Sequence, residues 1–159
     1  MGGRMTDGVT PGVKAPKWLD AYDSEVADSF LATNEKMTGL PAFLGVRFVE
    51  FAPGRLCAEM LVKPELLTPF GNMHGGVLSA VVDHVLGCVC YPHMKRGQWA
   101  ATTEFKINLL SPVSKGTVRA EAEIVSLTRS TAVVRIGLEN EGRAVGVAQG
   151  TVLIRDPKG

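Results

Sequence analysis

One long apolar segment, residues 71–90, constrains the fold of this chain more than any other feature. It reads GNMHGGVLSAVVDHVLGCVC, and its spacing predicts a helix from His74 or Gly75 to about Tyr91. The helix is apolar on nearly every side, so other elements must surround it. Asp83 lies in its middle, where an unpaired carboxylate is costly to bury. The segment therefore needs a partner that wraps the helix, and the carboxylate needs an explanation.

At about 100° per residue, the helix separates into a face of small and a face of large side chains. Asp83 shares its stripe with small residues, namely Gly76, Ala80, Gly87 and Cys90. The opposite side carries Leu78, Val82, Val85 and Val89. We expect the large side chains to pack on a sheet, and the small stripe to let a backbone or a ligand approach closely.

Strand-like segments make up most of the remaining chain. Apolar alternation between Phe43 and Val62 predicts a hairpin that turns at Pro53-Gly54. Four strand-like runs follow the helix, at Trp99 to Leu110, Gly116 to Leu127, Thr131 to Glu139 and Arg143 to Ile154. Runs of strands with one central helix predict an α+β domain with a curled, mostly antiparallel sheet.

The N-terminal part is predicted to contain a tail and one helix. Residues 1–16 lack hydrophobic periodicity and are interpreted as a flexible tail, which leaves residues 17–159 as a single domain. Apolar residues then recur at helical spacing from Trp18 to Leu31. This pattern predicts one amphipathic helix that ends near Gly39 and Pro41.

Composition and charge exclude several classes of function. The net charge of +1, with both signs mixed, gives no nucleic-acid surface. Asp83 and His84 interrupt the longest apolar run, so no membrane insertion is expected. Three cysteines without a pattern indicate reduced thiols in a cytoplasmic protein. The three histidines do not form a zinc pattern, and we expect no metal and no cofactor.

Two interpretations of Asp83 follow from the residues alone. A structural carboxylate would be paired with a Lys, an Arg or a backbone N–H. A catalytic carboxylate would lie in a cleft of low dielectric, where it can act as a base. Gly75 and Gly76 favour the second, because free N–H groups at a helix N-terminus stabilise anions and oxyanions.

The spacing of these groups also predicts an assembly. Gly75 and Asp83 are eight residues apart, roughly 12 Å along a helix axis, so one carbonyl cannot contact both in one chain. Two antiparallel helices related by a two-fold axis would bring Gly75 of one chain to Asp83 of the other. We therefore expect a homodimer with two shared sites, or a homotetramer built from such dimers.

Three segments of the chain together resemble a known family. They are PELLTPFGNMHGGVLSAVVDHVLG, TTEFKINLLSPVSKG and GRAVGVAQGTVLI, within a match that covers about Pro41 to Ile154. They resemble the hotdog-fold acyl-CoA thioesterases of the PaaI-like, phenylacetate-type family. The resemblance implies a hotdog fold, in which a curled antiparallel sheet wraps a central helix. It also implies hydrolysis of an acyl-CoA thioester to a carboxylic acid and CoA.

The resemblance assigns catalytic roles to four residues. Asp83 would be the general base or the nucleophile at the thioester carbonyl. The Gly75 N–H would polarise that carbonyl, and His74 would orient the loop or the thioester. Thr102 would position water, with the neighbouring Thr103 as the alternative.

Substrate-binding positions follow from the same resemblance. Thr68 stands where many relatives carry Asn, six residues before His74, and its shorter side chain holds water or a substrate oxygen less well. Gly76 would lie beside the substrate, and Arg129 and Ser130 lie at a strand turn that faces the CoA phosphates. Two further cationic residues, Lys106 and Arg96, have two interpretations. By their charge they could bind the CoA phosphates, or they could be solvated surface groups.

Other interpretations remain open at this point. A non-catalytic hotdog module that binds acyl-CoA would keep the cleft without needing the acid. A hotdog dehydratase or hydratase would use an Asp and His pair in a different motif, which this sequence lacks. His84 is interpreted as a core or interface histidine, and His93 as a solvated loop residue.

Overall fold

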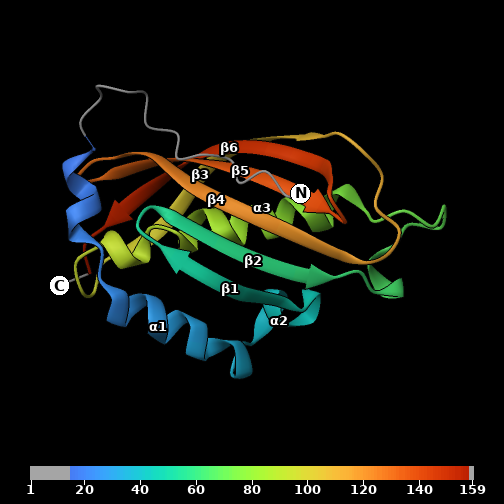
Figure 1. Ribbon diagram of the computed structural model, residues 1–159, viewed down its shortest axis with the longest axis horizontal. Helices are drawn as coiled ribbons and strands as arrows, with labels where there is room; N and C mark the ends of the chain where they lie inside the picture. The colour runs from blue at the N-terminus through green and yellow to red at the C-terminus, as the bar shows by residue number, and fades with distance from the viewer. Residues whose placement is uncertain (1–14, 158–159) are drawn as a thin grey trace.

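The computed structural model of the protein describes residues 15–157, so the tail predicted at residues 1–16 lies almost wholly outside it and stays a prediction. A six-stranded antiparallel sheet curls around one long helix, α3 (Gly75–Cys88), as Figure 1 shows. The strands are β1 (Val46–Ala52), β2 (Arg55–Leu61), β3 (Trp99–Leu109), β4 (Thr117–Leu127), β5 (Thr131–Asn140) and β6 (Arg143–Arg155). The predicted α+β architecture is therefore confirmed.

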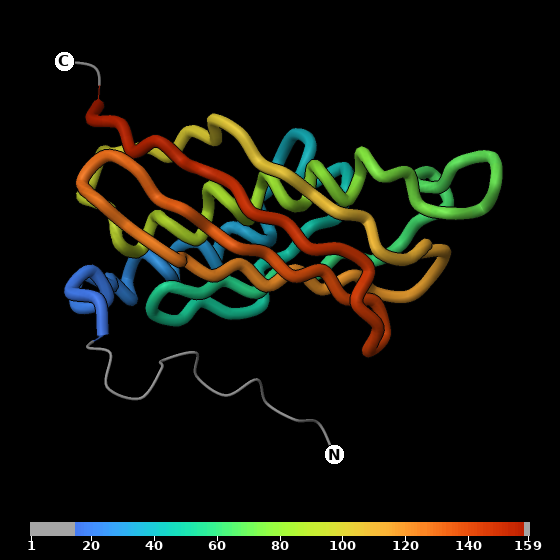
Figure 2. The backbone as a smooth tube through the Cα atoms, turned by 90° about the horizontal axis from the view of Figure 1, so that it is seen from above, coloured from blue at the N-terminus to red at the C-terminus, as the bar shows by residue number. Residues whose placement is uncertain are grey.

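The order of the strands places β3 at an edge of the sheet. The order is β1-β2-β4-β5-β6-β3, so the strand that follows α3 in the chain lies at the far side from the first hairpin. Figure 2 shows the strands running obliquely over the helix. The hairpin predicted at Pro53-Gly54 is confirmed, with Ala52 paired to Arg55 across the turn.

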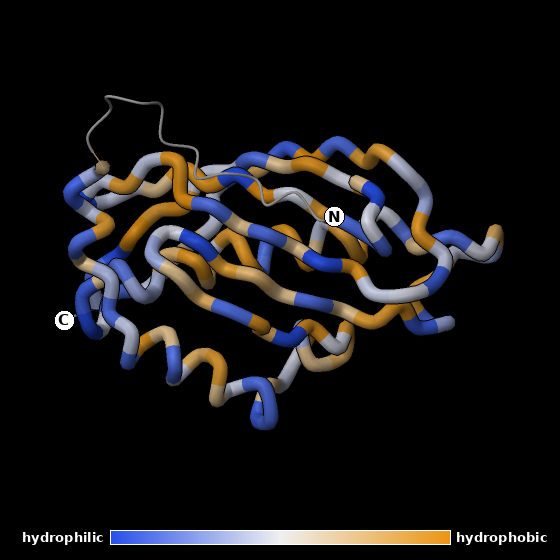
Figure 3. Tube along the Cα trace, viewed as in Figure 1, coloured by the Kyte–Doolittle hydropathy of each residue, from blue (hydrophilic) through white to orange (hydrophobic). Residues whose placement is uncertain are grey.

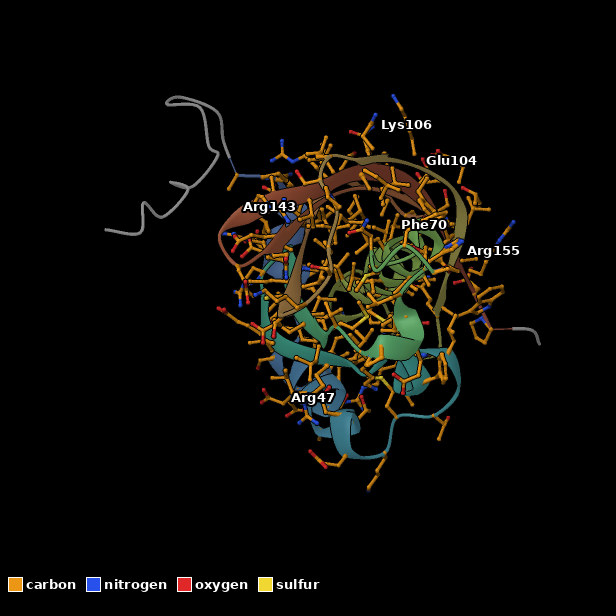
Figure 4. The ribbon with its side chains drawn as sticks, turned by 90° about the vertical axis from the view of Figure 1, so that its right-hand side faces the viewer. Arg47, Phe70, Glu104, Lys106, Arg143 and Arg155 are labelled. Carbon is orange, nitrogen blue, oxygen red and sulfur yellow. The ribbon has the colours of Figure 1, made fainter. Side chains whose placement is uncertain are left out.

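Alternation of apolar and polar residues along the strands explains why the sheet has an inner and an outer face. In β5, every second side chain is at most 2% exposed: Ala132, Val134, Ile136 and Leu138. Figure 3 shows this alternation as orange and blue segments along the strands. The inner face packs on α3, and Figure 4 shows the sheet curving around that helix when seen end-on.

The predicted large face of α3 is buried against this sheet. Leu78, Val82 and Val85 are at most 3% exposed. Segment Gly75–His93 is long and apolar enough to cross a membrane by length and composition alone. Because its large side chains fill the centre of the sheet, its apolar character is explained by the core of the domain.

Sequence periodicity overestimated the N-terminal helix. The segment forms η1 (Lys17–Ala21), α1 (Ser24–Ala32), η2 (Thr33–Glu35) and α2 (Gly39–Leu44) instead of one helix. Asp23 is extended, and its carboxylate accepts hydrogen bonds from Glu25 N and Val26 N, which starts a new helix there. Gly39 begins α2 with a φ of +68°, outside the range of a continuous helix.

The expectation for His93 was wrong, because this residue is a packed connector between three segments. It ends η4 (Tyr91–His93), where Nε2 accepts a hydrogen bond from Gly54 N–H and Nδ1 donates to Trp18 O. Trp18 and Tyr22 pack on its ring at centroid distances of 5.4 Å. Burial lowers the pKa of His93, whereas the hydrogen bond to Trp18 O acts in the opposite direction and raises it.

Candidate active site

Asp83 opens onto a cleft with a volume of about 620 Å³. The cleft lies between the second half of α3 and β3, and its walls are formed by Asp83, His84, Gly87, Cys88, Tyr91, Ala100, Thr102, Thr103, Glu104 and Phe105. Asp83 is exposed in the single chain, so the enclosed environment expected for this carboxylate is absent there. Its position in the wall of a cleft agrees with the catalytic interpretation.

The alternative of a paired structural carboxylate finds no support in residues 15–157. None of the salt bridges or side-chain hydrogen bonds in this part involves Asp83. A carboxylate without an internal partner is free to interact with water or with a ligand in the cleft.

A β-bulge shapes the opposite wall of the cleft. Thr102 pairs with Val152 and Glu104 pairs with Thr151, so Thr103 is the extra residue on β3. The Thr103 hydroxyl donates to Thr151 O at 3.0 Å. The Thr102 hydroxyl has no hydrogen-bond partner within residues 15–157, so of the two hydroxyls it is the one available to water or substrate.

Glu104 and Lys106 lie on the outer side of β3. Figure 4 shows both side chains pointing away from the helix. The Glu104 carboxylate accepts a hydrogen bond from the Thr151 hydroxyl at 2.6 Å. This contact fixes the rim of the cleft beside the bulge, whereas Lys106 lies outside the cleft.

The start of α3 offers fewer free donors than the sequence predicted. His74 caps the helix, and its Nδ1 accepts a hydrogen bond from Gly76 N–H at 2.9 Å. Gly76 N–H is therefore occupied, whereas the N–H of Gly75 has no hydrogen-bond partner within residues 15–157. Leu109 of β3 covers Gly75 so closely that a Cβ there would lie 2.6 Å from its Cδ1. His74, Gly75 and Gly76 do not line the Asp83 cleft of the same chain.

Thr68 shapes the loop that precedes α3, which follows η3 (Pro64–Leu66). Its hydroxyl accepts a hydrogen bond from Phe70 N–H at 3.3 Å, and its backbone N–H donates to Asn72 O at 2.7 Å. The Thr68 hydroxyl thus accepts a hydrogen bond within the loop itself, and its role toward a substrate stays a prediction.

His84 is packed between α3 and β1, as the sequence interpretation expected. Its ring stacks on Phe48 at a centroid distance of 5.3 Å and an angle of 14°. Its Nε2 is buried without a hydrogen-bond partner among the described residues. Burial lowers the pKa of His84, and the carboxylate of Asp83 opposes that shift. His84 is therefore a neutral side wall of the cleft near pH 7.

The cysteines are free thiols of low reactivity. All three, Cys57, Cys88 and Cys90, lie in the described part of the chain. Burial raises the pKa of Cys88 and of Cys90 to about 12, and that of Cys57 to about 11. Cys90, which helical spacing placed on the stripe of small residues, is fully buried beyond the end of α3 and does not line the Asp83 cleft.

The β4–β5 turn borders a second, smaller hollow of about 300 Å³. Arg129 lines this hollow together with Lys95 and Thr128. Ser130 lies in the same turn, where its N–H donates to the Thr128 hydroxyl and its carbonyl accepts from Ile154 N–H. Arg96 lies outside the hollow, in an exposed salt bridge with Glu25 at 3.6 Å.

Sequence reasoning missed five residues that line the Asp83 cleft: Cys88, Tyr91, Ala100, Glu104 and Phe105. Tyr91 could have been found, because Asp83, Gly87 and Tyr91 recur every four residues and so share one helical face. Within residues 15–157, no three His, Cys, Asp or Glu side chains gather into a group that would hold a metal ion.

Comparisons with known proteins agree with this architecture. The sequence profile of the thioesterase superfamily matches residues 70–147. Proofreading thioesterase EntH of Klebsiella pneumoniae is 32% identical over 111 residues, which cover 70% of this chain and 80% of that protein. Acyl-coenzyme A thioesterase 13 of Homo sapiens is 26% identical over 108 residues, or 66% of this chain and 75% of that protein.

Solved structures confirm the predicted hotdog fold. The PaaI protein from the phenylacetic acid degradation operon of E. coli superposes with a TM-score of 0.76 at 20% identity. The superposition covers 85% of this chain and 97% of that one.

Proposed function

We propose that Asp83 and Thr102 carry out the chemistry of this chain, which belongs to the thioesterase superfamily. The chain is a thioester hydrolase that acts on acyl-CoA. One observation supports this assignment most strongly. The unpaired carboxylate of Asp83 and the unbonded hydroxyl of Thr102 line the same cleft, from α3 and β3 respectively. A base and a water-positioning hydroxyl in one cleft are what hydrolysis of a carbonyl compound requires.

The proposed reaction replaces the C–S bond of the thioester by a C–O bond. Asp83 takes a proton from water, which attacks the carbonyl carbon, or attacks that carbon itself to form a mixed anhydride that water then hydrolyses. In both routes the carbonyl oxygen becomes an oxyanion that the Gly75 N–H stabilises, and His74 holds this helix start in place. The thiolate of CoA leaves and is protonated.

A shared site in a homodimer follows from the positions of these groups. Within one chain, the start of α3 does not line the cleft of Asp83. A two-fold axis between antiparallel α3 helices would place Gly75 of the partner subunit over Asp83. The small or exposed side chains of the open face of α3, including Gly76, Ala80 and Gly87, let two such helices approach closely.

The edge strand β3 supports the same two-fold axis. Within residues 15–157 its outer edge is unpaired, and exposed apolar side chains lie at both of its ends: Trp99 is 44% exposed and Leu109 is 53% exposed. Antiparallel pairing of β3 with its copy would place Trp99 beside Leu109 of the partner subunit. Pairing would also cover an edge that otherwise promotes aggregation. Sedimentation equilibrium measures the expected dimer, or a tetramer of two dimers.

We place the CoA phosphates at the β4–β5 turn. Arg129 and Lys95 supply two cations to the hollow there, and Ser130 and Thr128 supply polar groups beside them. The three free thiols support a reducing, cytoplasmic location.

The test is release of thiol from a panel of acyl-CoAs, from acetyl to palmitoyl with phenylacetyl and benzoyl. Wild type is compared with Asp83→Asn, which keeps the shape of the side chain and removes the base. We expect turnover by wild type and a loss of about 100-fold or more in the variant, the size typical of losing a general base.

Asp28→Asn is the matched control, because Asp28 is an exposed carboxylate on α1 and lies outside the cleft lining. It should retain wild-type turnover. Binding of acyl-CoA without turnover of any panel member would contradict the proposal and favour a non-catalytic acyl-CoA-binding module.

A further inference from the structure

Phe70 is the most exposed large apolar side chain of the described residues. It is 91% exposed, whereas the others in this group range from 44% to 63%. Its loop extends past the sheet in Figures 1 and 2, just before the start of α3, and Figure 4 labels the side chain at that end of the molecule. A full aromatic ring in water is unfavourable by about 25 cal/mol per Å² of apolar surface, so a covering partner is expected.

The loop that carries Phe70 has a defined shape. Leu67 and Met73 form a bridge at its base, and Thr68 binds Phe70 N–H and Asn72 O across its tip. Gly71 completes the turn with a φ of +81°. Phe70 is therefore held at a fixed place beyond the helix start, as a residue with a binding role would be.

The two-fold axis proposed above determines what this loop meets. Phe70 lies five residues before Gly75, and Cys88 lies five residues after Asp83. If Gly75 faces Asp83 of the partner subunit and the two α3 helices are antiparallel, Phe70 lies at the same height along the helix axis as Cys88 of the partner subunit. That height is the end of the partner's cleft, where Gly87, Cys88 and Tyr91 form the wall.

We propose that Phe70 of each subunit closes the end of the acyl cleft in the other subunit and limits the size of the acyl group. This inference rests on the proposed function and names the residue that determines its acyl specificity. The cleft of a single chain is open, and the residues at its end are small or flat. An aromatic ring from the partner completes an apolar wall for the part of the acyl group farthest from the thioester.

The kinetic test changes the size of this side chain. The quantity compared is kcat/KM for the bulkiest accepted acyl-CoA divided by kcat/KM for the smallest. Phe70→Ala should raise this ratio by about tenfold, because pocket contacts of this size discriminate between substrates by at least that factor. Phe70→Trp should lower the same ratio. Val125→Ala is the matched control, since Val125 is 51% exposed on β4 and lies outside the cleft. An unchanged ratio in both Phe70 variants would overturn the proposal while wild-type turnover upholds the proposed function.

A mixed dimer tests whether Phe70 acts across the interface. One subunit carries Asp83→Asn and the other carries Phe70→Ala, with different affinity tags. The only site with an intact Asp83 then receives Phe70 from the partner, so its acyl preference should equal that of wild type. An acyl preference equal to that of the Phe70→Ala homodimer would show that Phe70 acts within its own subunit, which overturns the proposal.

A cross-link tests the geometry without relying on catalysis. A photoreactive benzoylphenylalanine, which inserts into nearby C–H bonds, replaces Phe70. Irradiation should give a covalent dimer in which this side chain is joined to Gly87, Cys88 or Tyr91 of the partner subunit, as identified by mass spectrometry of the linked peptides. The same photoreactive side chain at position 125 is the control and should not link to this wall. A protein that sediments as a dimer but forms no such cross-link from position 70 would show that the loop does not reach that cleft. A covalent dimer in a protein without turnover would support the placement of Phe70 and contradict only the proposed function.

Discussion

The two faces of α3 come from one 14-residue helix but have opposite surroundings. On the face toward the sheet, Leu78, Val82 and Leu86 are at most 3% exposed and belong to the core. On the other face, Gly76 and Asp83 are exposed, and Asp83 has no partner within residues 15–157. The difference indicates that the first face holds the fold together, whereas the second is available for chemistry and for a second subunit.

The largest expected effect is on the sheet face. Leu86 is fully buried, and its Cδ1 comes so close to β6 that a Cβ on Gly150 would lie 2.5 Å from it. Leu86→Ala should lower the free energy of unfolding by about 3 kcal/mol, within the range of Leu to Ala changes in cores. Urea denaturation measures this loss. Turnover of the folded fraction should stay at the wild-type value. A lower kcat of the folded protein would contradict the assignment of stability to the sheet face and of chemistry to the open face.

The open face should respond in the opposite way. Asp83→Asn is expected to remove activity as described above and to change the free energy of unfolding by less than about 0.5 kcal/mol, as exposed substitutions usually do. The same urea experiment measures this change. A marked gain or loss of stability would mean that the carboxylate has a structural role that the single chain does not reveal.

A smaller effect is expected across the cleft, at Thr102. Thr102→Val removes the free hydroxyl and keeps the shape of the side chain. It should lower kcat/KM roughly three- to tenfold, which corresponds to a neutral hydrogen bond of about 0.5–1.5 kcal/mol. Thr117→Val on β4 is the control, and the two variants should be equally stable. Equal kcat/KM values for both variants would contradict a role of Thr102 in positioning water.

The smallest effect concerns His84, at the border of the two faces. His84→Phe keeps the stack on Phe48 and removes the unpaired Nε2, so it should raise the free energy of unfolding by about 1 kcal/mol at neutral pH. The pKa of His84 is lowered from 6.5 in the folded protein, so unfolding takes up a proton in mild acid. The stability that depends on neutral His84 is complete above pH 6.5 and is lost as the pH falls below it.

The difference in the free energy of unfolding between His84→Phe and wild type should therefore increase as the pH falls from about 7.5 to about 5.5. Because one proton is involved, this difference can grow by at most about 1.4 kcal/mol per pH unit. His93 titrates in both proteins and cancels in the comparison. A difference that stays constant with pH would show that His84 has a partner that keeps its pKa near the ordinary value.

The sequence by itself determined the elements whose signal is local. The strands from Trp99 onward, the hairpin at Pro53-Gly54 and the central helix were predicted within a few residues, because each repeats its apolar residues at the period of its own structure. The stripe that holds Asp83 and Gly87 was visible for the same reason. The helix boundary at Asp23 was missed, since the apolar spacing continues across a residue whose side chain caps a new helix.

Only the tertiary structure decided which of these residues meet. It placed β3 at the sheet edge, where the bulge at Thr103 leaves the Thr102 hydroxyl free in the cleft that Asp83 also lines. It also joined His93 to Trp18 and Gly54, which no local pattern could show. The physical reason is that periodicity reports which face of an element is apolar, whereas strand order, bulges and long-range hydrogen bonds depend on contacts between residues far apart in the chain.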